Sequence, residues 1–317
     1  MQTQYLPNAK IKPKKSVFKR FMDQIEIQSM VLPGIIFLIV FCYIPMYGVL
    51  MAFKKYNITS TSIINAPWAG LKYFKEFLAD ENLYIIIKNT LGMNIIGLAL
   101  GFPITIMFAL MLNEITSSKF KRVVQTISYL PHFISWVVFS GIVMRLLAID
   151  GGVINDYLLK FHLLSSPLFF LGEPKYFWGI SISSGFIKEL GWSAIIYLAA
   201  ITGVDPELHE AAIIDGAGRF QRMRHITIPC ITGTMMILLI LSISGILNSG
   251  FDQIYMLQNN LNYTASEVID TYVYKMGLGS MRYSYATAVG LLKSIIAVIL
   301  LVGANKFSKM VTDKSLF

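Results

Sequence analysis

Six long apolar stretches constrain the fold of this chain more than any other feature. A helix needs about 20 mostly apolar residues to cross roughly 30 Å of bilayer hydrocarbon. The composition agrees, because 55% of the 317 residues are hydrophobic and the mean hydropathy is +0.60, above the roughly 45 to 50% apolar residues of soluble domains. We therefore predict an all-α integral membrane protein with six transmembrane helices, over the ranges Met30–Phe53, Thr90–Asn113, Val124–Leu147, Phe177–Ile201, Cys230–Asn248 and Ala286–Asn305.

The segments between these stretches differ in basic residues. With the N-terminus inside, the inner segments hold fifteen Lys and Arg and the outer segments nine, as the positive-inside rule expects, although Lys54 and Lys55 go against it. We predict a cytoplasmic N-terminal segment at residues 1–29, a transmembrane domain at 30–305 and a cytoplasmic tail at 306–317. Residues before the first span fit either a helix on the inner membrane face or a solvated tail. The net charge of +9 then favours anionic lipid over nucleic acid as the partner.

The loop at residues 202–229 carries dense charge between two apolar stretches. At about 2.5 to 3.5 kcal/mol per charge, burying its seven charged residues in lipid would cost on the order of 20 kcal/mol, so the loop lies in the cytoplasm. Asp205 can cap a helix that begins at Pro206, and Gly216 can end it. These seven residues are Asp205, Glu207, Glu210, Asp215, Arg219, Arg222 and Arg224.

The pattern of this loop also carries a family resemblance. The sequence EAAIIDGAGRFQRMRHITIP from Glu210 to Pro229, together with LPGIIFLIVFCYIPMYGVLMAFKKYN, PWAGLKYF, FKRVVQTISYLPHFISWVV, GWSAIIYLAAITGVDPELHEAA and GILNSGFDQIY, resembles permease subunits of binding-protein-dependent ABC importers, in the carbohydrate-uptake branch for oligosaccharides and polysaccharide fragments. The likeness covers nearly the whole chain from the first span onward. It departs at Met223, where the family usually has Phe.

This resemblance implies a type I importer (MetI-like) permease fold in a bacterial cell membrane. The loop would be the coupling helix that docks on a cytoplasmic ATPase dimer, through Glu210, Ala211, Ala212, Asp215, Gly216, Ala217, Ile226 and Pro229. A second related permease, an extracytoplasmic solute-binding protein and a sugar substrate would be the other partners. The chain itself would bind no cofactor, because ATP and Mg²⁺ belong to the ATPase; the sequence has no G-x-x-x-x-G-K-[ST] loop for nucleotide phosphates.

Charged residues inside apolar stretches are candidates for a substrate path. Arg145 lies near the outer end of its stretch and can reach water, whereas Lys188, Glu189 and Lys293 lie near the middle of theirs. Neighbours on a helix point about 100 degrees apart, so Lys188 and Glu189 are not expected to pair well. Lys293 could pair with Glu189, or either lysine could line the path. The net positive charge of the three would suit a sugar that carries uronate groups.

Polar and aromatic residues give a second set of candidates. The outer end of the fifth span holds Asn248, Phe251, Asp252, Gln253 and Tyr255, which could bind a sugar or form an interfacial aromatic belt. His132 and Trp136 could line a cavity or serve helix packing.

Two alternatives of other classes remain at this stage. An ion-gradient-driven carrier could use Lys188, Glu189 and Lys293. A membrane enzyme would need an active site, but neither H-E-x-x-H nor G-x-S-x-G is present, and the four histidines show no metal-ligand spacing.

Overall fold

The computed structural model describes residues 25–57, 59 and 62–312, and the regular secondary structure of this part is helical apart from one isolated bridge between Lys54 and Trp68. Two compact units are present, Met1–Leu50 and Met51–Phe317. Most of the predicted N-terminal segment, including its possible interfacial helix, and the end of the predicted tail lie outside the described residues.

The first unit supplies one apolar helical stretch, which runs on into the start of the second. Helices α2 (Ile25–Leu38), η1 (Ile39–Tyr43), α3 (Ile44–Met46) and η2 (Tyr47–Phe53) follow one another without a gap. The π-turn η1 lies directly before Pro45, which has no N–H to donate. The wider turn accommodates the proline without ending the helix, and the apolar part, Ser29–Phe53, is 25 residues long.

The second unit contains four further helices long and apolar enough to span a membrane, so five of the six predicted stretches are found as such helices. They are α5 (Leu83–Glu114), α9 (Pro174–Thr202), α12 (Ile228–Ser244), which continues the turns α11 (Arg219–Arg222) and η4 (Met223–Thr227), and α16 (Tyr283–Thr312). Shorter elements connect them: α4 (Lys72–Leu78), α8 (Val153–Lys160), α10 (Pro206–Ile214), α13 (Phe251–Leu257), α14 (Tyr263–Ser266), α15 (Ile269–Tyr274) and η5 (Lys275–Gly279).

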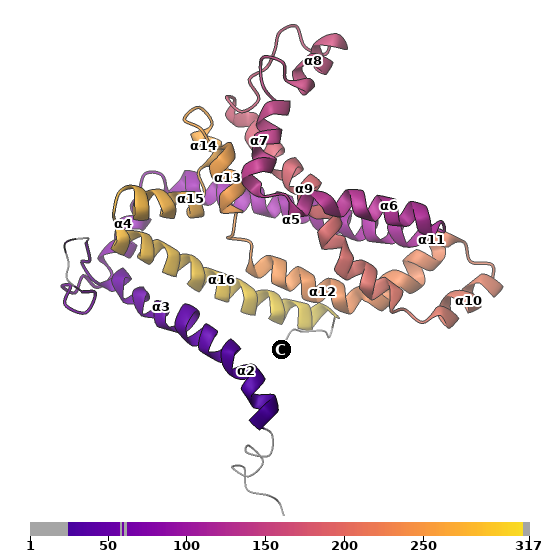
Figure 1. The fold of residues 1–317 in the computed structure, drawn as a ribbon, viewed down its shortest axis with the longest axis horizontal. Coiled ribbons are helices and arrows are strands. Elements are labelled where there is room, and N and C mark those ends of the chain that lie inside the picture. The colour runs from indigo at the N-terminus through magenta and orange to yellow at the C-terminus, as the bar shows by residue number, and fades with distance from the viewer. Residues whose placement is uncertain (1–24, 58, 60–61, 313–317) are drawn as a thin grey trace, which may run out of the picture. The chain divides into compact units, whose positions relative to one another are not determined.

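Helices α5 and α9 lie side by side and form the centre of this unit (Figure 1). Where the C-terminal halves of the two helices meet, their buried side chains form an apolar cluster that also includes Ile231 of α12. Glycines allow the close approach, because a Cβ at Gly92 would lie 2.2 Å from the ring of Trp178 and one at Gly101 would lie 2.8 Å from the ring of Phe186. Helix α12 then packs against both α9 and α16.

Helix α4 is anchored to α15 and α16 by a carboxylate beyond its end. Asp80 accepts hydrogen bonds from the hydroxyls of Tyr272 and Tyr285 and, at 2.8 Å, from the backbone N–H of Asn82. Burial alone would raise the pKa of Asp80, but these hydrogen bonds outweigh it and hold that pKa below its ordinary value of 3.8. Asp80 therefore remains ionised and keeps the three elements together down to low pH.

The third predicted stretch, Val124–Leu147, is a bent pair of helices rather than one straight helix, and it is the sixth candidate span when the pair is counted as one. It consists of α6 (Ser118–Tyr129), η3 (Leu130–Phe133) and α7 (Trp136–Leu146), with a bend of 104° between its two arms. Pro131 cannot donate a hydrogen bond in a continuing helix. Ser135 then starts α7 as its N-cap, because its hydroxyl accepts from the N–H of Val138, so the chain changes direction here.

The packing of α9 on α6 gives a first prediction. A Cβ at Gly191 would lie 2.2 Å from the carbonyl oxygen of Ser128, so Gly191→Ala forces the two backbones apart. We expect a loss of about 1 to 3 kcal/mol in stability, measured as a lower midpoint of thermal unfolding of the purified protein. Gly179→Ala is the matched control, since nothing lies within 4 Å of its Cβ position on the same helix. Equal midpoints for the two variants would contradict this account.

Candidate functional site

The first candidate site is the charged loop around α10. The helix begins at Pro206 as expected, and the side chain of Asp205 accepts a hydrogen bond from the N–H of Glu207 at 3.0 Å. The N–H of Ala217 donates to the carbonyl of Ala212 at 2.8 Å, and Gly216 takes φ +80°, a conformation that favours glycine. The end of the helix therefore has a fixed turn.

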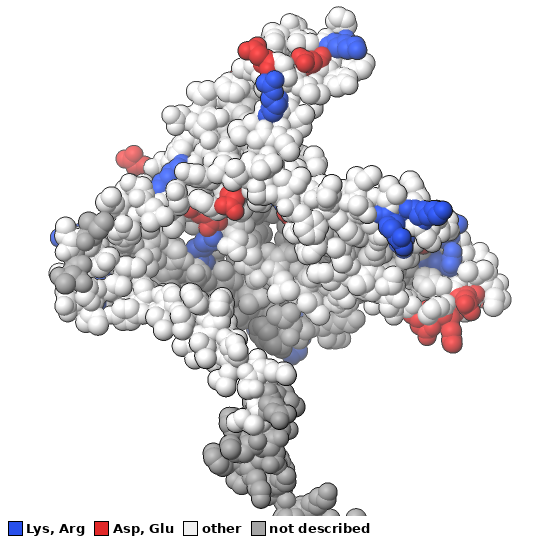
Figure 2. All heavy atoms as spheres, in the orientation of Figure 1, with Lys and Arg blue, Asp and Glu red and all other residues white. Residues whose placement is uncertain are grey.

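The surface of this loop is apolar as well as charged. Ile214 and Phe220 are 87% and 72% exposed, and Glu210 and Ala211 are also exposed. Acidic side chains gather over α10, whereas basic side chains gather over α6 and α11 (Figure 2). A hollow of about 380 Å³ lies between the end of α10 and the helical turns that follow Arg219. It is lined by five of the residues expected to dock on the ATPase, Ala212, Asp215, Gly216, Ala217 and Ile226, and by Gln221, Arg222 and His225.

The loop is shorter than residues 202–229, because the helix resumes at Arg219 and continues to Ser244. Ile226 and Pro229 therefore lie on this helix rather than in a loop. The π-turn η4 explains how the helix passes Pro229: the N–H of Ile228 bonds to the carbonyl of Met223, one residue further back than in an α-helix.

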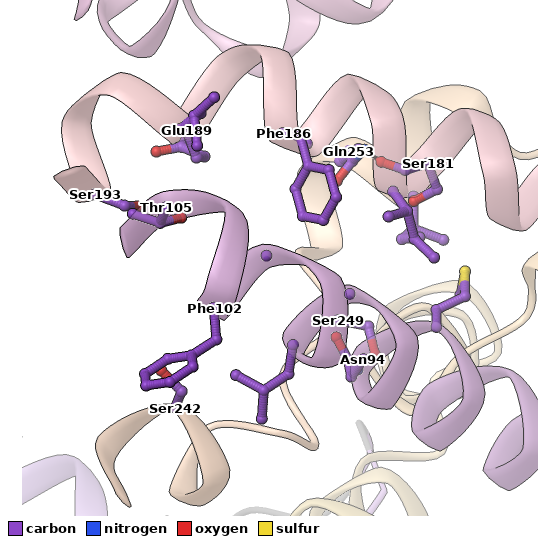
Figure 3. A pocket seen from close by; sticks show the side chains of 18 of the residues that line it. Asn94, Phe102, Thr105, Ser181, Phe186, Glu189, Ser193, Ser242, Ser249 and Gln253 are labelled. Atoms are coloured by element: carbon purple, nitrogen blue, oxygen red, sulfur yellow. Dashed lines mark hydrogen bonds between the residues drawn. The ribbon is translucent and has the colours of Figure 1, made fainter. Parts of the chain in front are cut away.

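The second candidate site is a cavity of about 380 Å³ between α5 and α9, closed by residues of α7, α12 and α13 (Figure 3). Its polar groups include Asn94 and Thr105 from α5, Glu189 and Ser193 from α9, and Gln253 from α13. Asn94 donates to the hydroxyl of Ser249 at 2.9 Å, and Gln253 donates to the carbonyl of Ser181 at 2.6 Å and to the hydroxyl of Ser184 at 2.9 Å.

Of the ten residues predicted for a substrate path, three line this cavity: Glu189, Gln253 and Trp136. None of the other polar residues of the cavity was predicted from the sequence. A signal was present, because Ser181, Gly185, Glu189, Ser193 and Tyr197 recur every four residues along α9 and all line the cavity. Gly97, Gly101 and Thr105 form the facing stripe on α5. Helical spacing of small and polar residues in an apolar span marks such a wall.

Lys188 does pair with Glu189, contrary to the prediction. Lys188 is only 3% exposed, and its Nζ lies 3.4 Å from Glu189 Oε1. Nζ also donates to the carbonyl of His132 at 2.7 Å and to that of Pro131 at 3.3 Å. The break between α6 and α7 leaves these carbonyls accessible, so the long side chain bends toward them and comes within reach of its neighbour.

His132 is the third member of a cluster with Lys188 and Glu189, here called the Lys188 cluster. Its Nδ1 lies 2.6 Å from Glu189 Oε2, and its ring stacks on that of Trp192 with the centroids 4.3 Å apart. Both oxygens of Glu189 therefore have partners. The ring of Trp136, which lines the cavity, lies 5.3 Å from Lys188 Nζ.

Lys293 pairs with Asp270 of α15 and not with Glu189. The other oxygen of Asp270 accepts from the N–H of Ser249 at 3.1 Å, so this ion pair fixes a residue of the cavity wall. Neither Lys188 nor Lys293 is among the described lining residues, and the expected positive lining is not observed there.

The remaining candidates lie away from the cavity. Phe251 and Tyr255 stack on each other, and Tyr274 meets the first ring at a tilt and the second edge-on, with all centroids 5.0 to 5.2 Å apart. Asn248 and Asp252 are exposed. Arg145 is also exposed, at the end of α7.

The Lys188 cluster gives a second prediction. Lys188→Met removes the donor of two carbonyl oxygens and the cation beside Glu189, and a buried polar group left without its partner costs about 1 to 3 kcal/mol. We expect a lower midpoint of thermal unfolding for Lys188→Met. Lys175→Met is the control, because the side chain of Lys175 is 64% exposed. An unchanged midpoint for Lys188→Met would show that the cluster does not stabilise the break.

Comparison with known proteins assigns the chain to a family. Residues 101–311 match the family described as binding-protein-dependent transport system inner membrane component. Protein LplB of Bacillus subtilis (strain 168) is 41% identical over 288 residues, covering 91% of this chain and 90% of LplB. The polygalacturonan/rhamnogalacturonan transport system permease protein YteP of the same organism is 40% identical over 304 residues, covering 96% and 94%.

Solved structures agree with these relatives. A chain of a bacterial ABC transporter involved in the import of the acidic polysaccharide alginate superposes with a TM-score of 0.86 and 38% identity, over 94% of this chain and 100% of that one. A chain of a bacterial alginate ABC transporter in complex with an alginate pentasaccharide-bound periplasmic protein gives 0.86 and 37%, over 95% and 100%.

These matches decide between the alternatives of the sequence analysis. A carrier driven by an ion gradient is not supported, and the chain is not an enzyme, since ATP hydrolysis in this family is done by a separate ATPase subunit. The all-helical fold and its apolar spans agree with a multi-pass membrane protein. The chain therefore belongs to the family of binding-protein-dependent transport system inner membrane components, the permease subunits of ABC importers.

Proposed function

We propose that this chain forms one half of the membrane path of an ATP-driven importer for oligosaccharides cut from acidic polysaccharides. Two of its relatives are named for such polymers, polygalacturonan/rhamnogalacturonan and alginate. A second related permease would supply the other half of the path. Two cytoplasmic ATPase subunits would bind Mg²⁺ and ATP, and an extracytoplasmic solute-binding protein would deliver the sugar.

The observation that carries this proposal is the exposed surface of α10 and α11. An isolated cytoplasmic loop has no reason to expose Ile214 and Phe220 beside a fixed glycine turn, because exposed apolar groups of this size mark a contact surface. The acidic side chains of α10, with Glu210 among them, fit a cleft that offers a basic partner, and Arg219 and Arg222 fit an acidic one. The ATPase is the subunit that must dock on this side.

This docking also sets the orientation. With α10 in the cytoplasm, the basic residues at the start of α6, which include Lys119 and Arg122, lie on the same side and face anionic lipid headgroups. With six spans, the bent pair of α6 and α7 counted as one, both termini would then lie in the cytoplasm.

The cavity between α5 and α9 would hold the sugar in transit. Hydroxyl and amide groups such as Thr105, Ser193 and Gln253 can bond sugar hydroxyls, while Trp136 and Phe186 offer aromatic rings. Glu189 is the charged residue of the described lining, but Lys188 and His132 contact both of its oxygens. The ion pair offsets the negative charge that would otherwise repel a uronate.

Transport then requires no covalent chemistry from this chain. Closure of the ATPase subunits would move α10, and the cavity would change from an inward-facing to an outward-facing state in which it accepts sugar from the binding protein. Release of the hydrolysis products would return it.

Reversal of one charge on α10 tests the docking. Glu210→Lys places a cation where we expect a basic partner, so uptake should fall to background and the ATPase should no longer copurify, while the amount of chain in the membrane stays the same. Glu81→Lys, also exposed but directly before α5 and therefore outside, is the control. Full uptake by the Glu210 variant would refute the coupling role.

Filling the cavity tests the sugar path. Gly97 lines the cavity and has nothing within 4 Å of its Cβ position, so Gly97→Leu occupies the space without moving the backbone. We expect uptake of labelled oligogalacturonate by the reconstituted importer to fall at least about tenfold, equivalent to roughly 1.4 kcal/mol, at unchanged thermal stability. Gly179→Leu, outside the cavity, should transport normally. Absence of uptake by the unmutated importer would contradict the proposed sugar class.

A further inference from the structure

Two amide side chains line the cavity between α5 and α9, and the first of them, Asn94 of α5, has both N–H groups in use. Its Nδ2 donates to the carbonyl of Thr90 at 2.7 Å and to the hydroxyl of Ser249 at 2.9 Å. A side-chain amide has two N–H hydrogens, so neither remains for a ligand. The described residues make no hydrogen bond to Asn94 Oδ1, and this oxygen is left as an acceptor.

The second amide, Gln253 of α13, is used in the same way. Its Nε2 donates to the carbonyl of Ser181 at 2.6 Å and to the hydroxyl of Ser184 at 2.9 Å. A backbone carbonyl can only accept, so it fixes which end of the amide faces it. The N–H groups of Gln253 therefore point into the protein, and Oε1 is the polar atom that remains.

The oxygen of Gln253 stays accessible although the residue is only 8% exposed. The described residues make no hydrogen bond to Oε1, and this atom is not among the buried side-chain atoms that lack a partner in the described part of the chain. Gly185, which lines the cavity, explains the access, because a Cβ at its position would lie 3.8 Å from Oε1. A glycine there leaves the oxygen uncovered.

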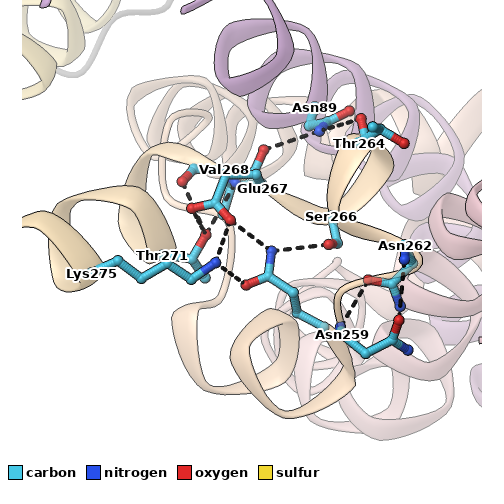
Figure 4. A network of polar contacts seen from close by, with 10 residues as sticks. Asn89, Asn259, Asn262, Thr264, Ser266, Glu267, Val268, Thr271 and Lys275 are labelled. Carbon is cyan, nitrogen blue, oxygen red and sulfur yellow. Dashed lines mark hydrogen bonds and ion pairs between the residues drawn. The ribbon is translucent and has the colours of Figure 1, made fainter. Parts of the chain in front are cut away.

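Helix α13, which carries Gln253, is itself fixed by a buried polar network (Figure 4). Gln258 directly follows the helix, and its amide donates to Glu267 Oε2 and to the hydroxyl of Ser266, both at 2.9 Å. Its carbonyl oxygen accepts from Lys275 at 2.6 Å, and Lys275 also pairs with the fully buried Glu267. The end of α13 is thus held in place, and Gln253 is held with it.

The rest of the described lining offers hydroxyls but no cation. The indole N–H of Trp136 is the side-chain nitrogen donor that remains there, and Glu189 is the charged group. A carboxylate is bound most strongly by a cation or by paired N–H donors, and the described lining contains neither Lys nor Arg. Its hydroxyls, which can both donate and accept, belong to Thr105, Ser181, Ser193, Tyr197 and Ser249.

We propose that Asn94 and Gln253 determine which groups of the sugar this wall binds: their oxygens accept from sugar hydroxyls, and the carboxylates of an acidic sugar point away. The inference rests on the proposed function, which places a sugar in the cavity. A sugar hydroxyl can donate to a fixed amide oxygen and accept from a hydroxyl such as that of Ser249. A carboxylate only accepts, so the two amide oxygens and Glu189 repel it. Its partners then lie across the path, on the second permease.

Neither amide can turn over to serve a carboxylate. Reversal of Gln253 would place Oε1 against the carbonyl oxygen of Ser181, and reversal of Asn94 would place Oδ1 against that of Thr90. Each reversal sets two acceptors face to face and leaves a carbonyl oxygen without its donor, which is costly away from water. The preference for hydroxyls is therefore built into the wall, although relatives are named for acidic polysaccharides.

The test measures direct binding of two sugars that differ only in charge. The complete importer in nanodiscs is titrated calorimetrically, without binding protein, with trigalacturonate and with its fully methyl-esterified form, which keeps the ring hydroxyls. Gly185→Ala covers Gln253 Oε1 at an ordinary contact distance, and Asn94→Leu removes the other acceptor. For each variant we expect Kd to rise about tenfold, as for the loss of one hydrogen bond, and by the same factor for both sugars.

Gly179→Ala is the matched control on the same helix, because Gly179 is outside the described lining and nothing lies within 4 Å of its Cβ position. It should leave both Kd values unchanged. Gly185→Ala keeps every hydrogen bond of Gln253, so this variant decides the outcome if Asn94→Leu lowers the midpoint of thermal unfolding.

Four results would overturn the proposal. Unchanged Kd values for both sugars would show that the amide oxygens do not contact the sugar. A larger loss for trigalacturonate than for its ester would show that this wall binds carboxylates. ATP-driven import of trigalacturonate by an unmutated importer that binds neither sugar would reject the inference and leave the importer function intact. Absence of that import would reject the proposed sugar class as well.

Discussion

The close packing of α5 on α9 is the contact on which the rest of the second unit depends. It is possible because glycines of α5 meet aromatic rings of α9, Gly92 against Trp178 and Gly101 against Phe186. Association of helices in a bilayer gains little from the hydrophobic effect, so close van der Waals contact must supply the attraction. Between the two close contacts of α5 and α9, the small residues that face each other leave a space, and this space is the polar cavity. One pattern of small side chains therefore both joins the helices and opens the path.

The ionisable groups within the spans act mainly on the protein itself. Lys188 binds the carbonyls at the break between α6 and α7, and Lys293 holds Asp270 against the N–H of Ser249. In both cases a lysine, buried at Lys188 and half-buried at Lys293, satisfies oxygen atoms that would be costly to leave unpaired away from water. The result is a cavity wall held in position by charge, while the surface that faces the cavity is nearly neutral.

Hydropathy was sufficient to locate five spans, because each is one long apolar helix, and the chemistry of Asp205, Pro206 and Gly216 was sufficient to place α10. At Val124–Leu147 it located the apolar stretch but not the bend, because the apolar character continues across Pro131 and Ser135 although the helix does not. The ion pairs made by Lys188 and Lys293 could not be predicted from the sequence, for a different reason. Lys188 depends on carbonyls exposed by that break, and Asp270 lies on a short helix outside the spans whose position only the tertiary fold defines.

Helix α9 connects every part of the proposed mechanism. It begins at Pro174, carries eight residues that line the cavity, and is separated from α10 by three residues. Its 29 residues contain no proline after the first position, so no proline kink interrupts the helix. In the proposed mechanism, a displacement of α10 by the ATPase would therefore reach the cavity wall through one continuous helix. The breaks lie elsewhere, between α6 and α7 and between α12 and α13. The parts of the wall that change position relative to α9 should therefore be the ones that these breaks carry, Trp136 on one side and Ser249 with Gln253 on the other.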